Sequence, residues 1–269
     1  MSECQFVVKA VSSSYWEVTF NNPPINLIGP NTIPQLNALI DKIESDPTLN
    51  VVVFKSNDPD FFMAHYDISD IAAFAALPPG PTGLDACNDV LVRLSRVPAL
   101  TVAALRGRAR GAGSEFVLAC DVRFASRERV VLGQFEVGGG AVPGGGPMAR
   151  LSRLVGPGRA LEILVGADDF TGELAERYRY VNRAVPDTEL DTFIDRFARR
   201  VAGFEKEAIV GTKAFVNEAT LPPVSELAPN MDAFFASVAR PEVQARESCR
   251  FRYGPAAPMW RRKPGTPRR

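Results

Sequence analysis

The sequence of 269 residues contains a single histidine, His65. A serine–histidine–aspartate triad would have to use this residue, but no G-x-S-x-G motif presents a serine nucleophile. One imidazole also leaves little besides carboxylates to hold a catalytic metal, and no H-E-x-x-H motif is present. The sequence therefore disfavours serine hydrolases and metal-dependent hydrolases, and we expect no metal site.

Cysteine is scarce and scattered. The four cysteines are Cys4, Cys87, Cys120 and Cys249. None forms a C-x-x-C pair or lies near a histidine cluster, so the pattern indicates neither a zinc site nor a disulfide framework. Reduced thiols in the cytoplasm fit this pattern best, and we expect a cytoplasmic protein.

An excess of charge of one sign is also missing, because 31 Lys and Arg balance 31 Asp and Glu. This balance argues against nucleic acid as a partner. No apolar run approaches the roughly 18 residues of a membrane helix, and residues 1–5 do not begin a signal peptide. We therefore expect no membrane partner. With 46% hydrophobic and 23% charged residues, the composition is that of a globular protein with a core.

The first half of the chain alternates strand-like and helix-like segments. Short apolar runs between Phe6 and Phe20 end at Asn21-Asn22-Pro23-Pro24 and predict a hairpin. Further segments follow in the order helix 33–43, strand 51–54, helix 84–96, strand 98–105, helix 114–120 and strand 121–125. This alternation predicts an α/β fold with a parallel sheet covered by helices.

Beyond Pro147 the pattern is almost continuously helical up to residue 238. No internal repeat and no long Gly/Ser linker divides the chain. We therefore divide it only loosely, into a core over residues 1–200 and a C-terminal helical region over residues 201–269. The region ends in a basic, proline-containing tail, which we interpret as a solubilising end.

Two glycine-rich stretches suggest a ligand site. One is Gly107-Arg-Ala-Arg-Gly111-Ala-Gly113, and the other is Gly138-Gly-Gly-Ala-Val-Pro-Gly144-Gly-Gly146. The first lacks the third glycine of a dinucleotide fingerprint, and the second lacks the Gly-Lys-Ser/Thr ending of a P-loop. Glycines can instead bring backbone N–H groups close to a ligand at a helix start, which makes an oxyanion hole. Two ordinary turns are the alternative.

A glutamate accompanies each glycine stretch. Glu115 falls in the first turn of the helix that Gly111-Ala112-Gly113 opens, and Glu136 directly precedes the second stretch. If the two carboxylates face one another, their repulsion leaves one as an acid and the other as a base. The alternative is that both are solvated surface glutamates.

Four segments together resemble the crotonase superfamily, the enoyl-CoA hydratases and isomerases. They are Phe62-Met-Ala-His-Tyr-Asp-Ile68, Gly107-Arg-Ala-Arg-Gly-Ala-Gly-Ser-Glu115 with Ala119-Cys120-Asp121, Gly133-Gln-Phe-Glu136, and Pro143-Gly-Gly-Gly146. Their order and spacing agree with the family over roughly residues 6 to 220. The resemblance implies a spiral of ββα units followed by a C-terminal α-helical region that supports trimerisation, as a homotrimer or a dimer of trimers.

The same resemblance implies an acyl-CoA thioester substrate, with coenzyme A as part of the substrate and no separate cofactor. Its carbonyl oxygen would lie between the backbone N–H groups of Tyr66 and Ala112, which stabilise an enolate-like oxyanion. The substrate-binding residues that it implies are Ala64, His65, Asp67, Ile68 and Gly111. His65 and Tyr66 stand where smaller residues are usual, which predicts a narrower or more polar acyl pocket.

Glu115 and Glu136 match the two glutamates of the hydratases. The resemblance implies that Glu115 orients and deprotonates a water that attacks the β-carbon, while Glu136 delivers a proton to the α-carbon. Enoyl-CoA hydration or its reverse is thus the first interpretation. Double-bond isomerisation, thioester hydrolysis and carbon–carbon cleavage are the alternatives on the same fold, and a non-catalytic acyl-CoA-binding scaffold is a third.

Overall fold

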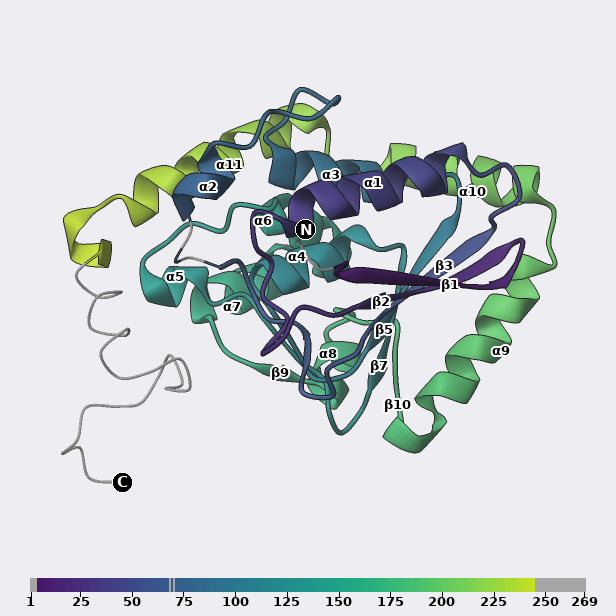
Figure 1. Ribbon diagram of the computed structural model, residues 1–269. Helices are drawn as coiled ribbons and strands as arrows, with labels where there is room; N and C mark the ends of the chain where they lie inside the picture. The colour runs from purple at the N-terminus through teal and green to yellow at the C-terminus, as the bar shows by residue number, and fades with distance from the viewer. Residues whose placement is uncertain (1–3, 68, 70, 245–269) are drawn as a thin grey trace, which may run out of the picture.

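Two β-sheets organise the chain in the computed structural model of Figure 1, which describes residues 4–67, 69 and 71–244. Within these residues the larger sheet has the strand order β1-β2-β3-β5-β7-β10, and the smaller one β4-β6-β8-β9. The larger sheet consists of β1 (Phe6–Ser12), β2 (Tyr15–Phe20), β3 (Val51–Ser56), β5 (Leu100–Leu105), β7 (Val122–Ser126) and β10 (Arg183–Val185). The smaller sheet consists of β4 (Phe61–Met63), β6 (Arg108–Arg110), β8 (Val131–Gly133) and β9 (Phe170–Thr171).

Helices surround both sheets. The described helices include α1 (Thr32–Ser45), α2 (Ile71–Ala75), α3 (Ala86–Arg96), α4 (Ala112–Ala119), α5 (Glu136–Gly139), α6 (Pro147–Val155), α7 (Pro157–Gly166), α8 (Gly172–Arg177), the 3-10 helix Asp187–Glu189, α9 (Leu190–Ala202), α10 (Lys206–Thr220) and α11 (Val224–Val238). In Figure 1, α1 and α3 lie on one side of the larger sheet and α9 on the other.

The central part of the chain repeats a strand–strand–helix unit. In each unit the first strand joins the larger sheet, the second joins the smaller sheet and a helix follows, as in β5-β6-α4 and β7-β8-α5. Corresponding strands of successive units pair in parallel, β5 with β7 and β6 with β8. This arrangement confirms the expected ββα architecture, and it places the start of α4 directly after β6.

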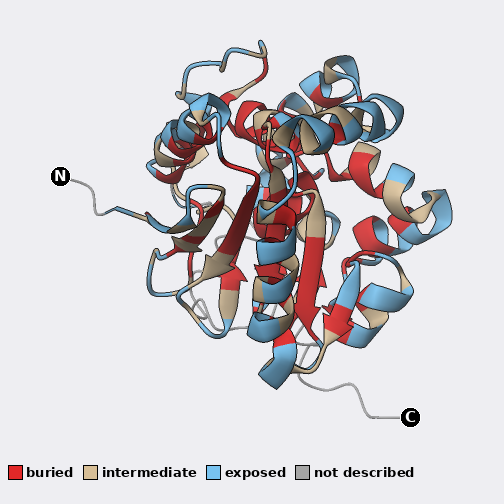
Figure 2. Cartoon of the chain, turned by 90° about the vertical axis from the view of Figure 1, so that its right-hand side faces the viewer, coloured by how far each residue is buried: buried red, intermediate tan, exposed pale blue. Residues whose placement is uncertain are grey.

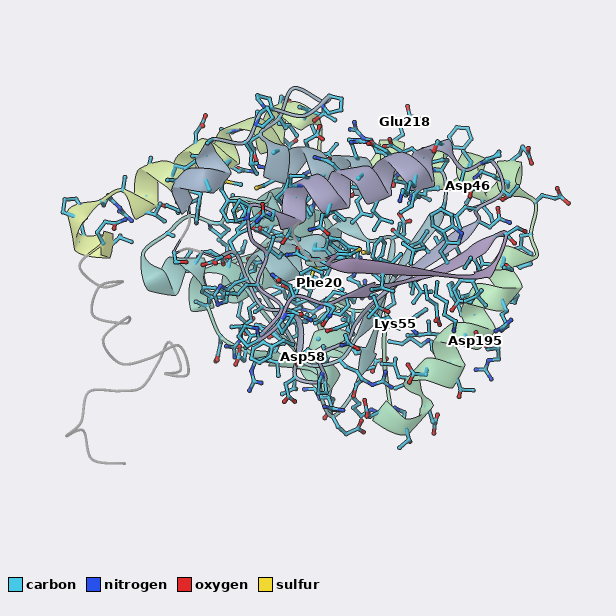
Figure 3. The ribbon with its side chains drawn as sticks, in the orientation of Figure 1. Phe20, Asp46, Lys55, Asp58, Asp195 and Glu218 are labelled. Atoms are coloured by element: carbon cyan, nitrogen blue, oxygen red, sulfur yellow. The ribbon has the colours of Figure 1, made fainter. Side chains whose placement is uncertain are left out.

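Each face of the larger sheet has its own apolar core, because side chains alternate along a strand. In β3, Val52 and Phe54 belong to the core under α1, whereas Val51 and Val53 belong to the core under α9. Figure 2 shows buried strands between helices whose outer faces are exposed. Charged side chains such as Glu218 on α10 lie toward the outside (Figure 3).

The prediction of nearly continuous helix beyond Pro147 is wrong in two places. Phe170–Thr171 forms β9, which pairs antiparallel with β8, and Arg183–Val185 forms β10, which pairs in parallel with β7. These strands have two and three residues, too few for any periodicity to show in the sequence. They tie the later part of the chain into both sheets.

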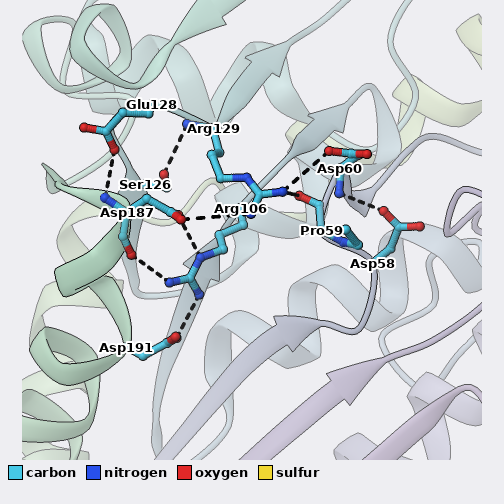
Figure 4. Close-up of polar contacts among 9 residues, drawn as sticks. All are labelled: Asp58, Pro59, Asp60, Arg106, Ser126, Glu128, Arg129, Asp187 and Asp191. Atoms are coloured by element: carbon cyan, nitrogen blue, oxygen red, sulfur yellow. Dashed lines mark hydrogen bonds and ion pairs between the residues drawn. The ribbon is translucent and has the colours of Figure 1, made fainter.

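A network of ion pairs links the loops at one end of the larger sheet (Figure 4). Arg106, which follows β5, donates to the carboxylates of Asp187 and Asp191 at 2.8 Å each. Arg129, between β7 and β8, lies 3.6 Å from the carboxylate of Asp60. The network thus connects the turn before β4 to the start of α9.

The helix α10 is anchored by a buried lysine. Lys213 is 9% exposed, and its Nζ donates to the backbone oxygen of Ala99 at 2.9 Å and to the carboxylate of Asp121 at 2.7 Å. Replacing it with Met leaves the Asp121 charge without its cation, so we expect the free energy of unfolding to fall by about 3 kcal/mol. Urea denaturation measures this loss.

The matched control is Lys9→Met, because Lys9 pairs with Glu17 but is 72% exposed. An exposed ion pair contributes little, and we expect this change to alter the free energy of unfolding by less than about 1 kcal/mol. Equal losses in the two variants would contradict the anchoring role of Lys213.

Candidate active site

The segment after β4 leaves one backbone amide without a partner. The N–H of Ile28 donates to the oxygen of His65, and the N–H of Asp67 donates to the oxygen of Ile28, both at 2.9 Å. Because successive peptide groups alternate along such a bridge, the N–H of Tyr66 points away from Ile28. It has no acceptor in the described part of the chain, so it is available to a ligand.

The start of α4 supplies a second amide. Gly111 precedes the helix with φ +50°, and Ala112 is its first residue, so the N–H of Ala112 has no helical acceptor. No other acceptor for it lies among the described residues. At Gly113 a Cβ would overlap the backbone oxygen of Met63, which shows how closely α4 approaches the strand leading to Tyr66. The two unpaired amides therefore lie on adjoining segments, as an oxyanion hole requires.

Glu115 lies one turn further along α4 and is 1% exposed. Its Oε1 accepts a hydrogen bond of 2.8 Å from the N–H of Gly145. A Cβ at Gly145 would overlap this carboxylate. The glycine stretch before α6 thus closes over Glu115, and the interpretation of Glu115 as a solvated surface residue is wrong.

Glu136 begins α5 and approaches the start of α4 from another side. A Cβ at Gly111 would lie 2.6 Å from its Oε1 and 3.1 Å from the Phe135 ring. Its Oε2 is buried without a hydrogen-bond partner among the described residues. Both glutamates therefore border the first turn of α4, Glu115 buried and Glu136 half-buried with one carboxylate oxygen shielded from water.

Burial raises the pKa of both carboxyls, and their different neighbours set the two apart. It raises the pKa of Glu115, whereas the Gly145 N–H and the positive charge of Arg150 act in the opposite direction. Burial and then the negative charge of Glu115 raise the pKa of Glu136. Glu115 is accordingly the group that ionises first, and Glu136 is the group that retains its proton.

His65 stands at the edge of this arrangement. Its Nδ1 lies 2.7 Å from the backbone oxygen of Tyr66, and because a carbonyl can only accept, Nδ1 carries the proton in this contact. The ring also meets Phe135 edge-on, with centroids 5.5 Å apart. His65 therefore links the Tyr66 segment to the segment that carries Glu136.

The Tyr66 side chain borders a small apolar cleft. Its ring meets Phe74 edge-on at 5.0 Å, and the buried Cys87 lines the same cleft. Met231 and Phe234 from α11 line the same cleft. The space left between these side chains holds about one water molecule. This small space agrees with the narrower acyl pocket that Tyr66 predicts from the sequence.

The other predicted substrate-binding residues differ in whether they border the cleft beside Tyr66. Ala64 is buried, and its N–H donates to the oxygen of Asn26 at 3.0 Å. Asp67 lines the cleft beside Tyr66, but its carboxylate accepts hydrogen bonds from the backbone and the hydroxyl of Ser69. Ile68 lies outside the described residues.

The sequence did not reveal the two residues that stabilise the ionised form of Glu115, Arg150 and Gly145. Arg150 is 7% exposed and influences Glu115 by its charge, but it is 35 positions away and belongs to no motif. The role of Gly145 as the hydrogen-bond donor to Glu115 was equally hidden, although its glycine run was recognised. Neither contact leaves a local signal, because both depend on how α6 packs against α4.

The described residues contain neither a metal-binding cluster nor a membrane-spanning helix. Residues 4–67, 69 and 71–244 contain no group of three or more His, Cys, Asp or Glu side chains that could hold a metal ion. Over the same ranges, every helix is too short or too polar to cross a membrane.

Fold and site together define a class: a protein of stacked ββα units in which two backbone amides without acceptors among the described residues and two carboxylates lie around the start of one helix. A family model described as enoyl-CoA hydratase/isomerase matches residues 11–250. The chain therefore belongs to the enoyl-CoA hydratase/isomerase family, the crotonase superfamily.

Relatives support this membership at two levels. A short-chain-enoyl-CoA hydratase of Clostridium acetobutylicum is 31% identical over 201 residues, which cover 74% of this chain and 76% of the relative. The crystal structure of a candidate enoyl-CoA hydratase from Streptomyces avermitilis is 44% identical, with a TM-score of 0.89, and covers 94% of this chain and 91% of that one. A structure from Geobacillus kaustophilus is 26% identical, with a TM-score of 0.74 and coverage of 94% and 96%.

Proposed function

We propose that this protein is an enoyl-CoA hydratase that adds water across the α,β-double bond of an acyl-CoA thioester, or removes it. The observation that carries the proposal is the pair of carboxyls at the start of α4: that of Glu115 accepts a hydrogen bond from the Gly145 N–H, and that of Glu136 packs against Gly111 with Oε2 buried and unpartnered among the described residues. Hydration needs one group to take a proton from water and another to give a proton to carbon. A single carboxylate would suffice for isomerisation, so the pair favours hydration.

The reaction follows from the contacts of each group. The thioester oxygen accepts hydrogen bonds from the N–H groups of Tyr66 and Ala112, which stabilise the negative charge as the enolate forms. Glu115 takes a proton from water as the water attacks the β-carbon, since its bond from Gly145 favours the ionised form. Glu136 then gives its proton to the α-carbon. The product gains one water, and Glu136 recovers its proton from Glu115 through solvent or a bound water.

Mass spectrometry of the products tests the proposed function. The protein is incubated with trans-2-enoyl-CoA esters of short, medium and long chains, and the mass of each ester is followed. Hydration adds one water to the ester. An unchanged mass with a moved double bond would instead indicate isomerisation, and release of free coenzyme A would indicate hydrolysis. Binding of the esters without any turnover would indicate a non-catalytic acyl-CoA-binding protein.

The pH dependence of kcat is a second test of the carboxyl pair. Burial raises the pKa of Glu115 to about 7 and that of Glu136 to about 8. Because only the singly protonated pair is active, we expect a bell-shaped profile that falls below about pH 7 and above about pH 8. Stopped-flow or steady-state rates across this range measure it. A constant kcat from about pH 5 to about pH 9 would contradict the acid–base assignment.

We propose further that the protein assembles as a homotrimer or a dimer of trimers. Support comes from large apolar side chains that are exposed in the single chain, Leu161 and Val165 on α7 and Phe215 and Val216 on α10. Sedimentation equilibrium is expected to give about three or six times the 29.2 kDa of one chain. A single 29.2 kDa species at all concentrations would contradict this assembly.

A further inference from the structure

Two buried hydroxyls, those of Ser114 and Tyr180, form a hydrogen bond next to Glu115 in α4. The phenol of Tyr180, just before β10, is hydrogen bonded to the hydroxyl of Ser114. Both residues are 0% exposed. Ser114 directly precedes Glu115 in α4 and lies two residues after Ala112. The hydrogen bond therefore acts on the helical turn that carries both the free amide and the first carboxylate.

The same phenol also reaches the segment of the second carboxylate. The side-chain amide of Gln134 lies beside it, although without an aligned hydrogen bond. Gln134 is 0% exposed and lies two residues before Glu136. Tyr180 thus stands between the two segments, Ser114–Glu115 and Gln134–Glu136, that approach each other to form the site.

Tyr180 is itself held firmly. Its N–H donates to the oxygen of Ala175 at 2.8 Å, and its carbonyl oxygen accepts from Nε of the buried Arg123 at 3.0 Å. Its ring meets Phe170 edge-on at 6.2 Å. Because the backbone and ring of Tyr180 are held in place, its hydroxyl can hold the Ser114 side chain in a fixed position.

The phenol stays neutral in this environment. Burial raises the pKa of Tyr180 well above its ordinary value, and the nearby charges of Glu136 and Glu115 raise the pKa further. A neutral phenol cannot act as a general base here. Its role is that of a hydrogen-bond partner of Ser114.

We propose that Tyr180 is a positioning residue, which fixes Glu115 and Glu136 relative to one another by binding Ser114 and contacting Gln134. The proposal rests on the proposed hydratase function, which it deepens. Tyr180 does not contact the reacting atoms. Its effect is on the alignment of the two carboxyls, and so on the rate of the chemical step more than on the binding of the thioester.

Kinetics of Tyr180→Phe and Ser114→Ala test this role. Each variant is expected to lower kcat about 10-fold and to leave KM within about twofold. Because both changes remove the same hydrogen bond, the double variant is expected to be no slower than either single variant. Losses in kcat that multiply in the double variant would overturn the proposal, and so would a kcat equal to that of the wild type.

The control is Tyr15→Phe. Tyr15 is also buried, at 1% exposed, and its hydroxyl donates to Glu17, but it belongs to the core under α9. Loss of a buried phenol there is expected to lower the melting temperature without changing kcat. A fall in kcat as large as that of Tyr180→Phe would show that any buried phenol has the same effect, and would overturn the positioning role.

Hydrogen exchange of the free protein gives a readout that needs no turnover. If the wild type converts no enoyl-CoA, the proposed function fails, and this experiment still decides the role of Tyr180. In Tyr180→Phe, amides of segments 108–120 and 130–140 are expected to exchange at least about fivefold faster than in Tyr15→Phe. Unchanged exchange in both segments would overturn the proposal.

Discussion

Replacing Glu136 by Gln is expected to lower kcat for enoyl-CoA hydration about 1000-fold, because the α-carbon then loses its proposed proton donor. Glutamine keeps the size of the side chain and removes only the acid. Glu115→Gln is expected to lower kcat similarly, since the attacking water then lacks its base. Steady-state kinetics on a short-chain enoyl-CoA measure both losses.

Three comparisons make this prediction specific. The affinity for a saturated acyl-CoA is expected to stay within about threefold of the wild type, because the substitution leaves the proposed thioester-binding amides of Tyr66 and Ala112 in place. Glu173→Gln removes an exposed carboxylate paired with Arg177 and is expected to leave kcat unchanged. Near wild-type turnover in both catalytic-site variants would refute the proposed mechanism.

The same substitutions are expected to alter stability in a direction set by the raised pKa values. The ordinary glutamate pKa is 4.5, and both folded-state pKa values lie above it. Between the ordinary pKa of 4.5 and the raised pKa of about 8 for Glu136, the folded protein holds more protons than the unfolded chain. The free energy of unfolding therefore falls as the pH rises through this range. Each glutamine substitution removes the part of this fall that its own carboxyl causes. Glu136→Gln is therefore expected to be more stable than the wild type at alkaline pH, which separates lost activity from lost folding.

Local patterns were sufficient to predict the larger elements of the fold. Apolar residues such as Ile33, Leu36 and Ile40 recur at helical spacing because α1 packs one face on the sheet. The runs at Val51–Phe54 and Val102–Leu105 are apolar throughout because these strands are covered on both faces. Burial on one or both faces is recorded directly in the order of residues.

The strands of the smaller sheet show no such hydrophobic pattern in the sequence. Its strands have two or three residues, and each pairs with a strand at least 20 positions away. Sequence spacing alone did not indicate it. The resemblance to the crotonase superfamily supplied the ββα repeat, and the structure shows how that repeat separates each pair of strands between two sheets.

The candidate site was predictable to the same extent. Glu115 and Glu136 were identified because each adjoins a glycine-rich stretch, and glycine next to a carboxylate is visible in sequence. The sequence left open whether they lie at one site or on the surface; in the structure Glu136 packs against Gly111 and Glu115 against Gly145, both beside the start of α4. Tyr180 had no signal at all, because its contact with Ser114 spans 66 positions and involves two common residue types.

Glycines leave room for both carboxylates, Gly145 for that of Glu115 and Gly111 for that of Glu136. Gly145→Ala is expected to lower kcat at least about 100-fold, because the new methyl group would occupy the place of the Glu115 carboxylate and displace it. The hydrogen bond from the Gly145 N–H would be lost with it. Gly145 has no positive φ, so alanine meets no backbone strain there and the effect is steric.

Gly211→Ala provides the matched control for this substitution. Gly211 lies inside α10, and a Cβ there meets nothing within 4 Å. Alanine favours helix over glycine, so this variant is expected to gain up to about 1 kcal/mol of stability with unchanged kcat. A fully active Gly145→Ala protein would show that Glu115 can work from another position. The close packing of Gly145 on its carboxylate would then have no part in catalysis.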